Sequence, residues 1–94
     1  MTGAEPHDVR LKRMRMRAAR RGTKEMDLIL GPFAKDRLPD MDESGLELFD
    51  ALLGENDQDL YQWVTRQAAA PAQFADLIAD IARHAGLIAD PVKL

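Results

Sequence analysis

Apolar residues recur along the chain at the three- and four-residue spacings of amphipathic helices, and no stretch shows the alternation of a β-strand. The first such pattern predicts a helix over about 9–21, with Asp8 as its N-cap and Gly22 as a left-handed stop. The apolar side of this helix consists of Leu11, Met14 and Ala18. Its other side is a stripe of arginines at helical spacing, namely Arg10, Arg13, Arg17, Arg20 and Arg21.

A second helix is predicted after Thr23, which can cap it. Gly31 and Pro32 interrupt its pattern, and a kink is expected there because proline lacks the backbone donor and crowds the preceding turn. The loop "LPDMDES" at 38–44 follows. The residues expected to be buried are Met26, Ile29, Leu30 and Phe33.

Three further helices are predicted at about 42–53, 57–66 and 72–85. Gly54 and Gly86 follow the first and last of them, Asn56 can cap the middle one, and Pro71 suits a first helical position. The expected core positions are Leu46, Phe49, Leu52, Leu53, Leu60, Trp63, Val64, Phe74, Leu77, Ile78, Ile81, Ala82 and Ala85. Short helices with short connections indicate an all-α fold, a compact five-helix antiparallel bundle over 9–86 with flexible ends at 1–8 and 87–94.

Composition favours one folded domain. The chain has 94 residues, of which 46% are hydrophobic and 31% charged, and no apolar run approaches the length of about 20 residues that a membrane helix needs. Eight of the thirteen basic residues fall within 10–24, where no acid occurs, whereas residues 25–94 carry five basic and fourteen acidic residues. We therefore expect a positive end on an acidic body.

Cysteine is absent, which excludes a disulfide framework and a thiolate zinc site and fits a reducing compartment. A basic N-terminal stretch can also belong to an organelle targeting peptide, but such peptides are rich in serine and poor in acids. This chain has one serine, and Glu5 and Asp8 precede its arginines. A bacterial cytoplasm is therefore the expected location.

The residues give little support for catalysis. His7 and His84 are far apart in sequence, no third ligand gives metal-site spacing, and no Gly-rich loop follows a strand to cradle a phosphate. Paired carboxylates such as Asp57 and Asp59 are common at helix starts. We therefore expect no metal site and no enzymatic activity, and no tightly bound cofactor.

The basic stretch has three possible functions. It can be a solvated helix face, a surface for nucleic-acid phosphates, or a docking surface for a protein, where the planar guanidinium of arginine binds carboxylates bidentately. An acidic chain without aromatic residues among the basic ones argues against nucleic acid. The turn at 20–25 can likewise be a simple joint between helices. Alternatively, it presents the guanidinium of Arg21 and the carboxylate of Glu25 outward, side by side, as a recognition surface.

Several segments resemble one known family. Arg21-Gly22-Thr23-Lys24-Glu25 matches an R-G-x-x-E motif, Arg20 precedes it, "MD" follows it, and "LILGPF" at 28–33 comes next. Downstream, "LFDALLGENDQDLYQWV" at 48–64 combines acidic residues with a D-L-aromatic-x-W pattern. In this order, over about residues 10–85, the segments resemble the SdhE-type flavinylation factors that assemble succinate dehydrogenase.

The resemblance implies a five-helix fold and a role as an assembly factor or chaperone. Its members bind the flavoprotein subunit of succinate dehydrogenase, and in some bacteria that of fumarate reductase, and promote covalent attachment of FAD to that subunit. The chain itself would hold no FAD tightly. By the same resemblance, Arg21, Gly22 and Glu25 are partner-binding residues, and the assignment extends to Arg20 and Asp27. The remaining alternatives are an antitoxin-like protein-binding regulator, as one homologue has been described, and a nucleic-acid-binding helical module.

Overall fold

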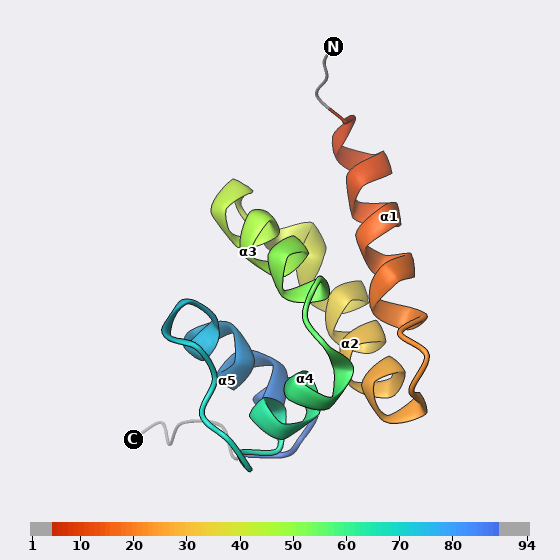
Figure 1. The fold of residues 1–94 in the computed structure, drawn as a ribbon. Coiled ribbons are helices and arrows are strands. Elements are labelled where there is room, and N and C mark those ends of the chain that lie inside the picture. Colours follow the sequence, from red (N-terminus) through yellow and green to blue (C-terminus); the bar gives the residue numbers. More distant parts are fainter. Residues whose placement is uncertain (1–4, 89–94) are drawn as a thin grey trace.

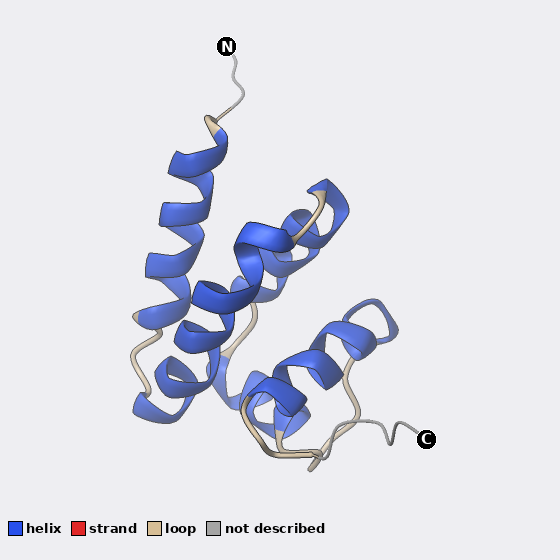
Figure 2. Cartoon of the chain, turned by 180° about the vertical axis from the view of Figure 1, so that it is seen from behind, coloured by secondary structure: helices blue, strands red, loops and turns tan. Residues whose placement is uncertain are grey.

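The structure, a computed structural model, describes residues 5–88, and all of the regular secondary structure in that range is helical, which confirms the predicted all-α fold (Figure 1, Figure 2). The α-helices are α1 (His7–Ala19), α2 (Lys24–Arg37), α3 (Glu43–Leu53), α4 (Asp57–Val64) and α5 (Ala75–His84). Two 3-10 turns, η1 (Leu38–Asp40) and η2 (Ala72–Phe74), lie between them. No helix within 5–88 is long and apolar enough to cross a membrane. Of the ends predicted to be flexible, 1–8 and 87–94, residues 1–4 and 89–94 lie outside the described residues, and residues 7 and 8 belong to α1.

Helix α2 occupies the centre of the fold. It packs along α1, from which residues 20–23 separate it, and its other sides contact α4 and α5, while α3 lies against α1 (Figure 1). Because α2 contacts α1 on one side and α4 on another, the start of α2 lies between the end of α1 and the start of α4. This is the region that the sequence marked as a candidate site.

The core contains nearly all the apolar residues predicted for it. Phe33 of α2 meets Phe49 of α3 with ring centroids 5.7 Å apart, and Trp63 of α4 stacks on Phe74 at 6.2 Å. Leu11, Ile29 and Trp63 are only partly buried, and Ala85 is exposed. The buried members are Met14, Ala18, Met26, Leu30, Phe33, Ala34, Leu38, Leu46, Phe49, Leu52, Leu53, Leu60, Val64, Phe74, Leu77, Ile78, Ile81 and Ala82.

Several helix boundaries differ from the prediction. Helix α1 begins at His7 after Pro6, so Asp8 lies inside the first turn and is not the N-cap. Helix α1 ends at Ala19, two residues before the predicted end, whereas α2 runs through Pro32 to Arg37, directly before the predicted loop at 38–44. Helix α4 ends at Val64 because Arg66 takes a left-handed conformation with φ of 68°.

Other boundary signals are confirmed. The Asn56 side chain accepts a hydrogen bond from the backbone nitrogen of Gln58 at 2.7 Å, as expected of the α4 N-cap. Asp42 likewise accepts from the backbone of Gly45 at the start of α3. Gly86, with φ of 77°, follows the C-cap of α5 in the way glycine favours. Gly22 is also left-handed, with φ of 101°, but α1 already ends at Ala19 with Arg20 as its C-cap, so Gly22 turns the chain toward α2 and is not the stop predicted for α1.

Candidate partner-binding surface at the α1–α2 elbow

The elbow between α1 and α2, residues 20–25, turns at Gly22. Its φ of 101° is one that other residues adopt only with strain, and a Cβ added there would meet no atom within 4 Å. The need for glycine is therefore conformational and not a matter of space. The turn brings the chain from α1 directly into the first turn of α2, where Glu25 lies.

Arg21 points from the elbow into the junction between α3 and α4. Its Nε lies 2.7 Å from Asp57 Oδ1, and the other guanidinium nitrogens donate to the backbone oxygens of Leu53 and, at 2.6 Å, of Glu55. The side chains of Arg21 and Asp57 are only 11% and 16% exposed. A planar guanidinium with several fixed donors suits this arrangement, because one side chain joins the elbow to three acceptors on a single loop.

Two further hydrogen bonds complete the junction. Asp27 accepts from the backbone nitrogen of Arg21 at 2.5 Å, and Thr23 Oγ1 donates to Asp57 Oδ2 at 3.2 Å. Thr23 precedes α2 in the N-cap position, but its hydroxyl contacts Asp57 and makes no hydrogen bond to the helix. Asp57 therefore accepts hydrogen bonds from the elbow through both of its oxygens.

The outward presentation predicted for Arg21 is wrong. Of the five predicted partner-binding residues, Arg20, Gly22 and Glu25 are exposed, whereas Arg21 and Asp27 are turned toward the protein. The guanidinium of Arg21 pairs with Asp57, and Glu25 makes no ion pair among residues 5–88, so the expected outward pair of the two charges is not formed. The physical reason is that Asp57 and two carbonyl groups satisfy the guanidinium of Arg21 inside the fold.

An open groove lies beside Glu25, between the start of α2 and the outer side of α4. Met26 forms part of its lining, and the volume is about 560 Å³. Glutamine amides and one phenol dominate its polar side. The lining residues are Thr23, Glu25, Met26, Asp57, Gln58, Tyr61, Gln62 and Gln67. Such a surface offers hydrogen bonds to a polypeptide, with one exposed carboxylate at its edge.

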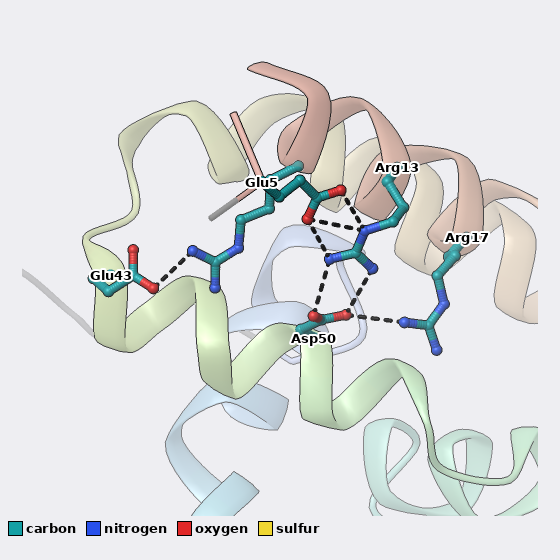
Figure 3. A network of polar contacts seen from close by, with 6 residues as sticks. Glu5, Arg13, Arg17, Glu43 and Asp50 are labelled. Carbon is teal, nitrogen blue, oxygen red and sulfur yellow. Dashed lines mark hydrogen bonds and ion pairs between the residues drawn. The ribbon is translucent and has the colours of Figure 1, made fainter. Parts of the chain in front are cut away.

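The arginine stripe of α1 is largely paired within the protein, as Figure 3 shows. Arg13 lies between Glu5 and Asp50, with its Nη2 3.2 Å from Asp50 Oδ2, and Arg17 approaches the other oxygen of Asp50 at 2.9 Å. Arg10 pairs with Glu43 at 2.7 Å. The arginine stripe was predicted to be a solvated face or a partner-binding surface. At Arg10, Arg13 and Arg17 it instead forms ion pairs between α1 and α3.

These pairs shift the pKa values of their members. The hydrogen bond from Arg10 lowers the pKa of the Glu43 carboxyl, and the same bond raises the pKa of Arg10. Glu5 and then Asp50 raise the pKa of Arg13. The charged form of each group is therefore favoured in the folded protein.

Sequence reasoning missed the acidic partners of the basic residues. Asp50 is the shared partner of two arginines, and Asp57 anchors the elbow. Asp57 was read only as an acid in the first turn of α4. No local pattern in the sequence shows that the Arg21 guanidinium reaches this carboxylate, because the two residues are 36 positions apart.

The sequence model of the family described as "flavinator of succinate dehydrogenase" matches residues 12–85, which include the elbow and all of α2–α5. The chain belongs to the family of succinate dehydrogenase flavinators. Curated relatives of this flavinator-family chain bear the name "Succinate dehydrogenase assembly factor 2, mitochondrial". The one from Cryptococcus neoformans is 37% identical over 86 residues, covering 89% of this chain and 49% of that protein.

Two other relatives extend the comparison. The Saccharomyces cerevisiae protein is 42% identical over 62 residues, covering 66% of this chain and 38% of its own length. The Drosophila grimshawi protein is 33% identical over 82 residues, covering 85% of this chain and 56% of its own length. The flavinator-family chain thus spans about half or less of the length of the first relatives it matches.

These comparisons correct the predicted location. The relatives from fungi and a fly are named as mitochondrial proteins, which points to mitochondria and away from a bacterial cytoplasm. The prediction rested on the absence of cysteine and on the poor fit to a targeting peptide. A lack of cysteine is compatible with many compartments, so it does not single out a bacterial one.

Proposed function

We propose that this flavinator-family chain binds the flavoprotein subunit of succinate dehydrogenase and promotes covalent attachment of FAD to that subunit. The observation that carries the proposal is the match of the flavinator model to residues 12–85, with the Arg21-Gly22-x-x-Glu25 motif inside it. The relatives named as assembly factors of succinate dehydrogenase support the same reading.

The elbow is the proposed contact with the flavoprotein. Arg20, Gly22 and Glu25 are exposed on it and are available to a partner. Arg21 and Asp27 have a supporting role, because their hydrogen bonds hold the backbone that carries those three residues. A recognition surface held rigid before binding loses little conformational entropy when the partner arrives.

The proposed mechanism is selection of a conformation. Covalent attachment requires the flavin and its acceptor histidine, both in the partner, to be held in reactive geometry. A protein that binds this conformation of the flavoprotein more tightly than others raises its population without supplying a reactive group. In this proposal the chain is not an enzyme, FAD remains with the flavoprotein, and the chain holds no FAD tightly of its own.

A reconstitution tests the function. The flavoprotein subunit without its flavin is incubated with FAD, either with or without the 94-residue chain. The mixture is then denatured, and the covalently attached flavin is measured by in-gel fluorescence. The expected result is stronger fluorescence when the chain is present and a weaker gain with Arg20→Ala/Glu25→Gln. Equal fluorescence with and without the chain, under conditions where attachment proceeds, would overturn the proposal.

A further inference from the structure

The outward sides of α1 and α2 carry large apolar side chains that the core does not use. Val9 and Met16 are seven residues apart on α1, so they lie on one side of that helix, and they are 50% and 44% exposed. Leu28 on α2 is 64% exposed, more than any other large apolar side chain described as exposed. Pro32, one turn further along α2, is exposed as well.

A close helix contact joins these sides into one surface. Gly31 of α2 lies against Ala19 of α1, since a Cβ added to the glycine would be 3.5 Å from the alanine Cβ. Met16 precedes Ala19 by one turn, and Leu28 precedes Gly31 by one turn. Two views show the helices side by side (Figure 1, Figure 2). The small residues let α1 and α2 pack closely at this contact, so the exposed apolar groups of both helices belong to one helix pair.

The same surface is positively charged. Arg10, Arg13 and Arg17 turn toward α3 and pair there. A second set of basic side chains is exposed and makes no ion pair within residues 5–88. On the outward sides of α1, the elbow and α2, this set includes Lys12, Arg15, Arg20, Lys24 and Lys35. We call these five residues, with Val9, Met16, Leu28 and Pro32, the outer α1–α2 face.

We propose that the outer α1–α2 face docks an acidic amphipathic segment of the client flavoprotein. This inference rests on the proposed function and adds a second contact, which continues from the elbow through Arg20. Basic groups around scattered apolar groups match a segment in which acids alternate with apolar side chains. Such a contact speeds the encounter through charge and fixes the angle at which the elbow meets its partner.

Other occupants fit this face less well. An amphipathic helix that binds lipid generally inserts a broad apolar side with Trp, Phe or Leu, and this face has one leucine and no aromatic residue. A single-stranded nucleic acid requires aromatic stacking platforms, which the face also lacks. The acids of residues 25–94 further oppose approach to any extended anionic surface.

A matched pair of double variants tests the inference with the purified flavoprotein subunit. Lys12→Glu/Leu28→Ser alters the outer α1–α2 face, and Arg66→Glu/Leu87→Ser makes the same change of charge and of apolar character after α4 and α5. All four positions are exposed, so both variants should remain folded. We expect the first to weaken binding about tenfold or more and to flatten its salt dependence, and the second to stay within about twofold.

The outcomes separate the inference from the proposed function. If the outer-face variant binds as the wild type does while Glu25→Gln weakens binding, the second contact is wrong and the proposed function stands. If the wild-type chain does not bind the flavoprotein, both fail. Vesicles of phosphatidylcholine with a third of phosphatidylserine are measured in parallel. Wild-type binding to them that Lys12→Glu/Leu28→Ser abolishes, with flavoprotein binding unchanged, would assign the face to membranes and overturn the inference.

Discussion

Arg21 and Asp57 join the α1–α2 elbow to the start of α4 across 36 residues of sequence, with 2.7 Å between Nε and Oδ1. Both side chains are largely buried, and the same arginine donates to the backbone of Leu53 and Glu55. The arginine of the motif is thus part of the framework, and the glutamate is its exposed member.

Replacing Arg21 with alanine should destabilise the fold. The change leaves the Asp57 carboxylate and two carbonyl groups without their donor in a mostly buried place, which costs about 2–3 kcal/mol. Arg21→Lys should recover only part of this, because one ammonium cannot reach three acceptors along a loop with the same geometry. Urea denaturation followed by circular dichroism measures the free energy of unfolding.

The control for Arg21→Ala is a double-mutant cycle with Asp57→Ala. The two residues should couple by about 1 kcal/mol or more, since each alone leaves the other unpaired. Strict additivity of the two losses would show that the ion pair does not hold the elbow, and that the arginine acts only through the backbone carbonyls.

Glu25→Gln should separate recognition from stability. The Glu25 side chain is exposed and makes no ion pair among the described residues, so the free energy of unfolding should change by less than about 0.5 kcal/mol. Binding to the flavoprotein subunit should weaken by about fivefold or more, because the proposed contact loses its charge. Isothermal titration calorimetry gives the affinity. A variant that binds as tightly as the wild type would remove Glu25 from the interface.

Gly22→Ala should destabilise the protein through backbone strain alone. At a φ of 101° an alanine is strained, at a cost of about 1–2 kcal/mol, although its Cβ would contact nothing within 4 Å. Gly31→Ala is the matched control, because it lies inside α2 and its Cβ would make an ordinary contact with Ala19. That change should be neutral or stabilising by up to about 1 kcal/mol. Thermal unfolding of both variants checks the contrast, and equal losses would contradict it.

Local patterns in the sequence predicted most of the fold. Asn56 caps α4 and Gly86 follows the end of α5 as predicted, and the spacing of apolar residues identified the core of α3 and α5. Gly31 and Pro32 do not end α2, which continues to Arg37 despite the missing backbone donor, and Phe33 and Ala34 are buried immediately after the proline. Burial of those side chains outweighs the local preference.

The site was less predictable because it depends on pairs distant in sequence. Nothing local shows that Arg21 reaches Asp57, or that Arg13 and Arg17 share Asp50. From the sequence alone, both charged residues of the R-G-x-x-E motif, Arg21 and Glu25, are expected to contact a partner. Only the three-dimensional structure shows that the Arg21 guanidinium points inward and that the Glu25 carboxylate is exposed.

The Arg10–Glu43 pair should make stability depend on acidity. The pKa of Glu43 is lowered in the folded protein, so the unfolded chain takes up a proton first as the pH falls. The stabilisation is therefore complete above the ordinary pKa of glutamate and is lost as the pH falls through the lowered value. Melting temperatures of the wild type and Glu43→Gln, measured between about pH 6 and pH 3, should converge toward the acid end. A constant gap across that range would mean that the carboxylate charge contributes nothing, and that Glu43 acts through packing at the start of α3.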